Sequence, residues 1–493
     1  MKCGEERKPF KMDVNNAPLV KALMEYAKQG TVRFHMPGHK GGKAFPRAFL
    51  DNLAAMDVTE IPGMDNLYCP VGVIAQAQML AAKAFGAHHT FFMVNGSTAG
   101  IQAMVMAACK PGDKLIVPRN SHRSVWSAMI LADVKPVYIQ PRYDQENSMA
   151  TQILVQDVER ALDENPDAVG VLVVHPNYYG MCSHLEQIEK VVHDREKLLL
   201  VDEAHGAHFI FHPDLPPSAG QLGADMWVQS AHKTLPALTQ GAYFHVRGPR
   251  VDANRAAQVI AMLQTSSPSY LIMASLDWAR ALMEAEGKAL IERLMHEIHK
   301  VKTRLRGHIG LLTIDDYDKG EEVAALDPTR LVLDVRPLGI TGYQAERLLR
   351  EAGVQVEMSD IYRLVLICSV ADNRTAFNVL IEALTSLAKK LPAHRFGPSA
   401  AYKYNKMSIS GEIPQQMLSP REAFYSIIEN VPIEKSVGRI CAGVIGAYPP
   451  GIPRFCPGEL IDKAGIDELL DIQRYGGTLF GLVEDALVPV VSE

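Results

Sequence analysis

The sequence lacks an uncharged apolar stretch of the roughly 18 residues that a membrane-spanning helix needs. It also lacks blocks of lysine and arginine: 50 basic residues are spread over 493 positions and are outnumbered by 56 acidic ones, for a formal charge of −6. The first eight residues are polar or charged, without the apolar segment of a secretory signal behind them. We therefore expect a cytoplasmic protein without a membrane span and without a nucleic-acid-binding surface.

Cysteines are few and scattered. The seven residues form no CxxC pair, and their odd number is typical of reduced thiols rather than of a disulfide framework. Apolar residues make up 47% and charged residues 22%, which excludes a disordered chain and indicates a globular one. At about 100–200 residues per domain, the length predicts about three domains.

Apolar runs alternate with helical patterns from residue 73 to about 245. The pattern predicts strands at 90–94, 114–117, 135–140, 169–174, 198–201 and 226–229. It predicts helices at 73–85, 98–109, 122–131, 154–163 and 184–194. Continuous apolar strands between helices are typical of a parallel sheet that is covered on both faces. A sheet of this kind binds its ligand at the carboxyl ends of its strands.

Four parts follow from the pattern along the chain. Residues 1–34 form an N-terminal arm with an amphipathic helix at 13–29, and 35–305 form the large domain, which includes a long bridging helix at 271–305. Residues 306–392 alternate strand and helix as a small α+β domain. A join rich in Pro, Ala and Tyr at 392–404 leads into a C-terminal domain, 393–493.

Polar clusters at three predicted strand or helix ends have the composition of a pyridoxal-phosphate site. Lys233 follows one strand and could bind the cofactor covalently, and Asp202 ends another and could keep the pyridine nitrogen protonated. The turn Gly96-Ser97-Thr98 opens a helix, where backbone N–H groups, hydroxyls and the positive helix end suit a phosphate. The combination is far more specific than any one of its parts.

Competing interpretations of these segments are weaker. Asp202-Glu203-Ala204-His205 also occurs in helicases, but no GxxxxGK[ST] phosphate loop is present. Asp202, His205 and His208 could bind a metal, yet the two histidines lack the i, i+4 spacing of a helical metal site, and no cysteine cluster supports them. We therefore expect no metal.

Five motifs make the sequence similar to the bacterial ornithine/lysine/arginine decarboxylases of aspartate-aminotransferase fold. They are His35-Met36-Pro37-Gly38-His39-Lys40, Asn95-Gly96-Ser97-Thr98, Asp202-Glu203-Ala204-His205-Gly206-Ala207-His208, Ser230-Ala231-His232-Lys233-Thr234 and Tyr448-Pro449-Pro450-Gly451-Ile452-Pro453. The resemblance covers residues from about 13 to 480 in the same order, and it is closest to the short form without an N-terminal wing domain. It implies a fold-type I α/β architecture, in which a large domain with a mostly parallel seven-stranded sheet is joined by small and C-terminal α+β domains.

The resemblance also implies roles for single residues. Lys233 should carry pyridoxal 5'-phosphate, Asp202 should pair with the pyridinium, His122 should stack on the ring and His205 should lie near it. The phosphate should be held by Gly96, Ser97, Thr98, Ser230 and His232. The catalytic candidates are Lys233, His122, Asp202 and His232. The active site should lie between two subunits of a homodimer or higher oligomer, with residues 265–269 reaching the partner's phosphate.

The implied reaction is decarboxylation of a basic L-amino acid in polyamine synthesis. Conversion of arginine to agmatine is favoured, and lysine and ornithine are open alternatives. A proton returns to Cα from Lys233 or from a nearby histidine. The acids Glu357 and Asp360 are candidates for binding the cationic end of the substrate, and His35 and His39 are further substrate candidates.

Two segments, 64–67 and 175–179, differ from the usual family pattern where substrate contacts could lie.

The rival functions are a fold-type I aminotransferase, which would share the cofactor residues, and a silent relative that only binds a partner.

Overall fold

A seven-stranded sheet lies at the centre of the large domain in the computed structural model, which describes residues 16–391, 413–448, 451–484 and 486–492. Its order is β2-β11-β10-β9-β7-β3-β4, and only β11 runs antiparallel to its neighbours. The strands are β2 (His89–Met93), β3 (Lys114–Pro118), β4 (Lys135–Ile139), β7 (Ala168–Val174), β9 (Leu198–Asp202), β10 (Met226–Gln229) and β11 (Ala242–Val246). This confirms the mostly parallel seven-stranded sheet.

Strand β11 was not among the strands that the alternating pattern indicated. Only the four-residue helix α9 (Ala231–Thr234) and a short loop separate it from β10. An antiparallel return of this kind needs no crossover helix, so the strand–helix alternation that predicts the other strands is missing here.

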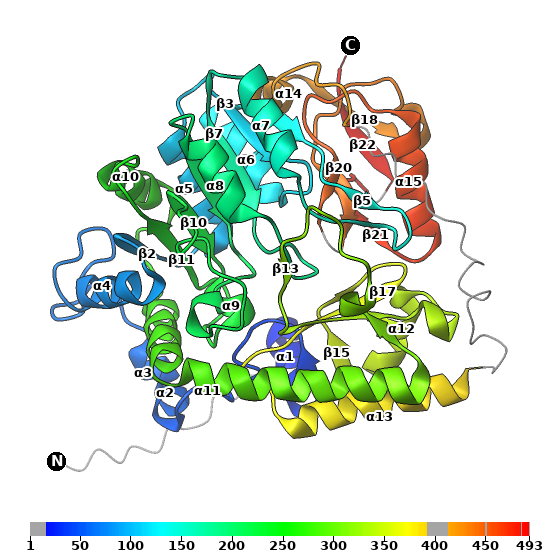
Figure 1. Cartoon of the computed structure of the whole chain (residues 1–493). Coiled ribbons are helices and arrows are strands. Elements are labelled where there is room, and N and C mark those ends of the chain that lie inside the picture. The colour runs from blue at the N-terminus through cyan, green and yellow to red at the C-terminus, as the bar shows by residue number, and fades with distance from the viewer. Residues whose placement is uncertain (1–15, 392–412, 449–450, 485, 493) are drawn as a thin grey trace.

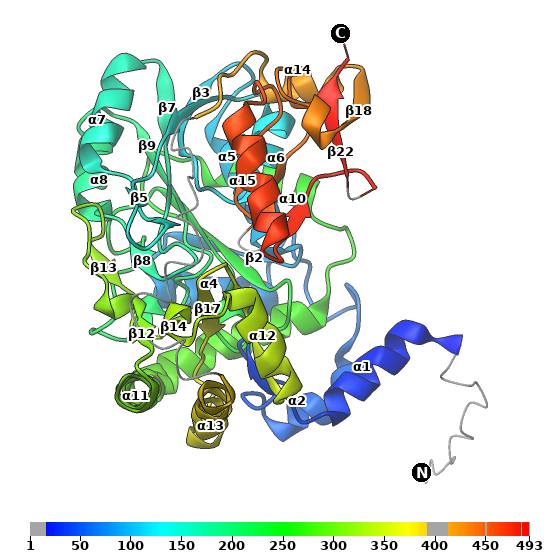
Figure 2. The ribbon, with the colours of Figure 1, turned by 90° about the vertical axis from the view of Figure 1, so that its right-hand side faces the viewer.

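Helices cover both faces of the sheet, because the central strands are apolar on both sides. On one face α5 (Gly96–Ala108), α6 (Arg123–Ala132) and α10 (Ala253–Leu263) share a core with Leu115 and Val117. On the other face α7 (Val155–Glu164) and α8 (Leu185–His193) share a core with Ile116 and Val173 (Figure 2). A third core joins α4 (Val73–Phe85) to the long helix α11 (Tyr270–Ile309).

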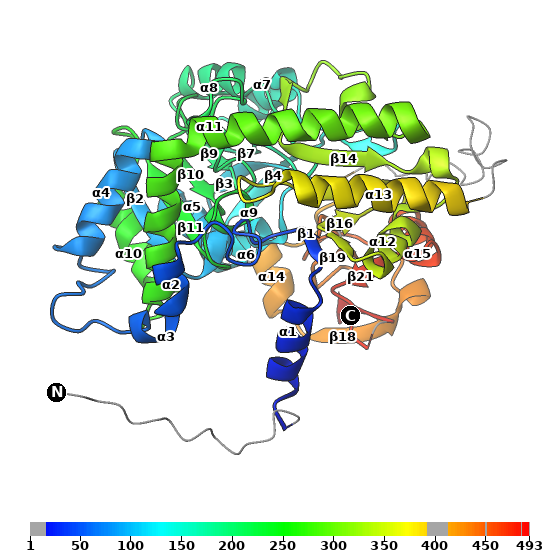
Figure 3. The ribbon, with the colours of Figure 1, turned by 90° about the horizontal axis from the view of Figure 1, so that it is seen from below.

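Helix α11 passes beneath the large and the small domain, with α13 (Arg374–Lys390) at its side (Figures 1 and 3). The small domain has a four-stranded antiparallel sheet of order β12-β14-β17-β16 and the helix α12 (Gly342–Glu351). Its strands are β12 (Leu312–Thr313), β14 (Arg330–Asp334), β16 (Met358–Ser359) and β17 (Arg363–Ile367). Within the described residues, no helix is long and apolar enough to cross a membrane.

The N-terminal segment contributes a strand to the small domain. After the helix α1 (Pro18–Lys28), β1 (Val32–Phe34) pairs in parallel with β15 (Val354–Val356). Phe34 is fully buried in the small-domain core. The turn that follows contains the first motif and leads into the short helices α2 (Arg47–Asp51) and α3 (Leu53–Met56).

The C-terminal part packs against the large domain as a separate α+β unit. It contains α14 (Pro420–Tyr425), α15 (Lys463–Arg474), the pair β18 (Ile428–Pro432) and β22 (Leu487–Val491), and the sheet of β19 (Ile445–Tyr448), β20 (Pro453–Phe455) and β21 (Thr478–Phe480). The predicted join at 392–404 and the motif residues Pro449 and Pro450 lie outside the described residues.

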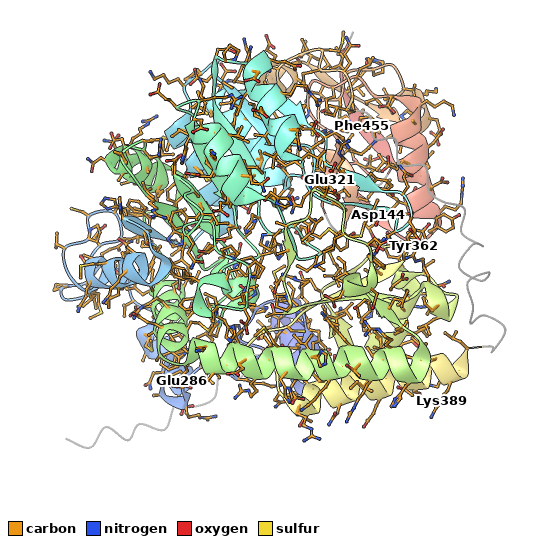
Figure 4. The ribbon with its side chains drawn as sticks, viewed as in Figure 1. Asp144, Glu286, Glu321, Tyr362, Lys389 and Phe455 are labelled. Carbon is orange, nitrogen blue, oxygen red and sulfur yellow. The ribbon has the colours of Figure 1, made fainter. Side chains whose placement is uncertain are left out.

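Short strands connect the parts. A hairpin of β5 (Tyr143–Asp144) and β6 (Met149–Ala150) extends from the large domain, and β8 (Met181–Cys182) pairs with β13 (Ala325–Leu326). Arg336 of the small domain donates hydrogen bonds to Glu146 O and to Asn147 Oδ1 of the hairpin. Figure 4 shows side chains filling this junction, with Asp144 and Tyr362 labelled.

Candidate active site

The carboxyl ends of five strands meet at one edge of the large sheet, as parallel strands require. The loops that leave β2, β3, β7, β9 and β10 contribute side chains to one cavity. Its wall is formed by Ser97, Asn120, His122, Ser124, Ala150, Val174, Pro176, Asn177, Tyr178, Tyr179, Asp202, Ala204, His205, Lys233, Gly451 and Ile452. The structure therefore brings together five residues that the sequence indicated: Ser97, His122, Asp202, His205 and Lys233.

Asp202 and Lys233 contribute a carboxyl group and an amine to the cavity wall. Asp202 ends β9, and its Oδ1 accepts a hydrogen bond of 3.1 Å from Ala204 N. Burial raises the pKa of the Asp202 carboxyl and the Lys233 ammonium opposes that rise. Burial likewise lowers the pKa of Lys233, while the Asp202 carboxylate opposes the change.

Two hydroxyl groups meet at the start of α5. Gly96 opens this helix at φ +77°, a left-handed conformation that favours glycine. Ser230 Oγ donates a 2.6 Å hydrogen bond to Ser97 Oγ, which joins the end of β10 to the first turn of α5. Two hydroxyls beside helix N–H groups fit a phosphate, because an anion is favoured at the positive end of a helix.

His122 is the N-cap of α6, where its Nδ1 accepts a hydrogen bond of 3.3 Å from Ser124 N. Burial, with Lys233 and Arg123 as neighbouring cations, lowers its pKa to about 3. Its ring is therefore neutral at physiological pH.

His205 lies between Lys233 and Tyr178. Its Nε2 is 3.1 Å from Lys233 Nζ, and its ring centroid is 4.6 Å from that of Tyr178. Lys233 Nζ lies 5.7 Å from the Tyr178 ring centroid. Lys233 is thus surrounded by a histidine, an aromatic face and the cavity.

Of the five predicted phosphate residues, Ser97 is part of the cavity wall in the single chain, whereas Gly96, Thr98, Ser230 and His232 are not. Thr98 is exposed on α5, and His232 is buried with its Nδ1 3.0 Å from Gly241 O. Burial lowers the pKa of His232 to about 4.

The four substrate candidates also lie outside the cavity wall. Glu357 Oε2 accepts a 2.9 Å hydrogen bond from Met36 N, and Asp360 accepts hydrogen bonds from Tyr179 Oη and Arg363. His35 Nε2 is 2.9 Å from Tyr26 Oη, and His39 Nδ1 accepts from Gly42 N.

The first motif holds the small domain against the lysine loop. Gly38 N donates to His232 O at 2.7 Å, and a Cβ on Gly38 would stand 2.4 Å from Leu235 O, so only glycine fits. The buried Lys40 donates to His35 O and Ile367 O, both at 2.7 Å.

The two segments that differ from the family pattern have structural partners. The carboxylate of Asp65 accepts hydrogen bonds from the backbone N–H groups of residues 66, 71, 72, 74 and 75, which lowers its pKa to about 2. It therefore fixes the start of α4. In the second segment, Asn177 and Tyr178 line the cavity, whereas the His175 ring packs away from it, with Nε2 3.2 Å from Pro217 O.

The C-terminal domain reaches the cavity through Gly451 and Ile452, which sequence reasoning did not place there. Arg119, at the end of β3, anchors this segment: its Nη1 donates to Pro453 O and its Nη2 to Arg454 O, both at 3.0 Å. Nη2 also forms a buried ion pair of 2.8 Å with Glu459. Nothing in the local sequence around Arg119 or Glu459 indicates this contact.

Glu459→Gln should lower the free energy of unfolding by about 3–5 kcal/mol, because it leaves the buried Arg119 guanidinium without its countercharge. Urea denaturation followed by intrinsic fluorescence measures the loss. Asp167→Asn is the matched control: it breaks the exposed Lys114–Asp167 pair and should leave the unfolding midpoint unchanged. Equal midpoints for Glu459→Gln and the unchanged protein would contradict the anchoring role.

Comparisons with known proteins place these features in a family. Residues 17–317 match the family model described as Orn/Lys/Arg decarboxylase, major domain, and residues 403–484 match the C-terminal domain of the same family. The chain is 40% identical over 470 residues to an arginine decarboxylase of Bacillus anthracis, covering 93% of each chain. It is 39% identical over 461 residues to an arginine decarboxylase of Bacillus subtilis (strain 168), covering 92% of this chain and 93% of the relative.

Solved structures show the same fold. The lysine decarboxylase of Francisella novicida superposes with a TM-score of 0.77 at 22% sequence identity, over 96% of this chain and 81% of that one. The alanine–glyoxylate aminotransferase of a Nostoc species reaches a TM-score of 0.53 at 18% identity, over 69% of this chain and 92% of that one.

Proposed function

The chain belongs to the Orn/Lys/Arg decarboxylase family, and on that premise we propose that it converts L-arginine to agmatine and carbon dioxide. The observation that carries the proposal is the meeting of Lys233, Asp202, His122 and Ser97 around one cavity. An inactive relative that only binds a partner would not need this set of residues together. The aminotransferase shares the fold at 18% identity, so it supports no shared activity.

The family's cofactor, pyridoxal 5'-phosphate, fits the residues of the cavity. Lys233 would hold it covalently and Asp202 would face its pyridine nitrogen, since the only hydrogen bond to the Asp202 carboxylate among the described residues comes from Ala204 N. Ser97 and Ser230 would hold its phosphate at the start of α5. When bound, the cofactor supplies an electron sink for the charge left on Cα as carbon dioxide departs.

The residues of the chain position and protonate the substrate. The neutral ring of His122 covers one wall of the cavity, and Tyr178 closes another beside Lys233. Lys233 Nζ and His205 Nε2 lie 3.1 Å apart in the cavity wall, and we propose that one of them returns the proton to Cα. Apart from Asp202, the wall in the described residues contains no carboxylate.

Among the four substrate candidates, we propose Glu357 as the residue that binds the cationic end of the substrate. Burial lowers the pKa of Lys233, and the Glu357 carboxylate opposes part of that change, so Glu357 lies near the site although it is not part of the wall. Asp360 is already engaged by Tyr179 and Arg363. A carboxylate can bind a guanidinium through two parallel hydrogen bonds, which favours arginine over lysine or ornithine.

The proposal predicts the ranking of substrates. The value of kcat/KM for arginine should exceed that for lysine or ornithine by about 10²-fold or more, because a site built for the guanidinium leaves its acceptors unpaired with a shorter amine. Amine release from each amino acid, measured separately on the holoenzyme, tests this. A preference for lysine or ornithine would refute the substrate, and no amine from any of the three would refute the reaction.

We further propose a homodimer or higher oligomer with the site at its interface, working in cytoplasmic polyamine synthesis. Apolar side chains stay exposed in the single chain, including Val71 at 88% and Met79 at 65%, and α1 buries none of its residues. The loop 265–269, which the resemblance assigns to the partner's phosphate, is exposed at residues 265–267 and adjoins this surface, since Tyr68 Oη donates to Thr265 O. The described cysteines are free thiols, in keeping with a reducing compartment.

A further inference from the structure

Arg330 is a buried cation whose position behind the cavity calls for an explanation. It begins β14 with 2% exposure, and its Nη2 donates a 3.2 Å hydrogen bond to His205 Nδ1. Nη1 is buried without a hydrogen-bond partner in the described part of the chain, and no carboxylate there lies within ion-pair distance of this guanidinium. Burying a cation without a paired anion costs several kcal/mol, so stability alone does not account for Arg330.

The contact fixes which nitrogen of His205 carries the hydrogen. A guanidinium has only donors, so the imidazole nitrogen that faces Arg330 must present a lone pair. The hydrogen of the neutral ring is then on Nε2, which lies 3.1 Å from Lys233 Nζ.

The same chain of contacts sets the protonation of Lys233. An Nε2–H group donates, so Lys233 Nζ must accept, and only the neutral amine has a lone pair to accept with. Burial, with the Arg330 guanidinium beside the ring, holds the pKa of His205 well below its ordinary value of 6.5, so the ring stays neutral.

We propose that Arg330 is a positioning residue that fixes His205 as the Nε2–H tautomer and thereby holds Lys233 as the neutral amine that receives the cofactor. The lone pair of Lys233 Nζ attacks the aldehyde carbon of pyridoxal phosphate and a C=N bond replaces C=O. The carbonyl oxygen leaves as water with the two hydrogens of the amine. This inference rests on the cofactor of the proposed function and not on its substrate.

Arg330→Met should slow covalent reconstitution of the apoenzyme with pyridoxal phosphate by about 10-fold at neutral pH, equivalent to one pKa unit on Lys233. Without the guanidinium, His205 can move its hydrogen to Nδ1 and accept from a Lys233 ammonium, which cannot attack. The two rates should converge at high pH, where the lysine is neutral in both proteins. Absorbance of the covalent adduct, followed from pH 6 to 11, gives the profile.

Two variants separate positioning from support of the fold. Arg330→Lys retains a cation that can donate to His205, so it should restore part of the wild-type pH profile of reconstitution. Arg336→Met removes a small-domain arginine that donates hydrogen bonds to Asp334 and Asn147, and it should leave that profile unchanged. Wild-type pH dependence in Arg330→Met would overturn the proposal.

A direct readout needs no variant at position 330 and no activity. Nitrogen NMR of histidine-labelled apoprotein, with the His205 signals assigned by His205→Asn, should show hydrogen on Nε2. Hydrogen on Nδ1 would overturn the proposal even if Arg330→Met failed to fold. A wild-type enzyme that shows this tautomer and takes up the cofactor, yet releases no amine from arginine, would refute the decarboxylase proposal and leave this one standing.

Discussion

Lys233→Ala should lower kcat for amine release by about 10³-fold or more, which is the scale of losing a covalent catalytic group. The variant loses the amine that binds the cofactor and one of the two groups able to return a proton to Cα. It should also lose the absorbance of the covalently bound cofactor while keeping its fold, because Lys233 borders the cavity and forms no ion pair in the described residues.

Steady-state amine release and the visible spectrum measure the two effects together. Lys83→Ala is the control, since it truncates an exposed lysine in the last turn of α4 and should change neither. Normal turnover by Lys233→Ala would remove the basis of the mechanism. A normal spectrum with lost turnover would instead show that another lysine holds the cofactor.

Asp202→Asn should lower kcat by about 10²- to 10³-fold, on the scale of losing a group that stabilises charge in a buried site. The amide has the same shape and can still accept the hydrogen bond from Ala204 N, but it carries no charge to keep the pyridine nitrogen protonated. KM should change little, because the proposed partner of Asp202 is the cofactor rather than the substrate.

Glu203→Gln is the matched control for Asp202→Asn. Glu203 is the adjacent residue and is also buried, but it faces away from the cavity and accepts from Ala219 N and Gln229 Nε2. Burial raises its pKa to about 8, so at pH 7 the carboxyl is mostly neutral and an amide changes no charge. Its kcat should stay near that of the unchanged enzyme, and an equal loss in both variants would argue against a role specific to Asp202.

The parts of the site that follow strands could be predicted from the sequence. Local apolar runs indicate the strands, and the geometry of a parallel sheet then brings the residues after them to one edge, which places Asp202, Lys233 and Ser97 together. The resemblance to the family adds His122 and His205, which also line the cavity. Their catalytic roles stay predictions until the variants are measured.

Features that depend on distant packing could not be predicted. Arg330 contacts His205 across 125 positions, and Arg119 holds Glu459 across 340, and no local pattern encodes either contact. For Asp65 the sequence suggests a role that the structure does not show. An acid in an irregular segment suggests a substrate ligand, yet the Asp65 carboxylate accepts hydrogen bonds from backbone N–H groups. Such outcomes follow from the fold as a whole, since it decides which polar groups find partners.

The central claim is decarboxylation with a proton returned to Cα, and one measurement tests it most directly. The holoenzyme is incubated with arginine in D₂O, the product is returned to H₂O, and its mass is read by mass spectrometry. We predict agmatine with one non-exchangeable deuterium, because the bond to the carboxylate is replaced by a bond to a solvent-derived proton. A keto acid, or arginine recovered with deuterium at Cα and no agmatine, would contradict the account.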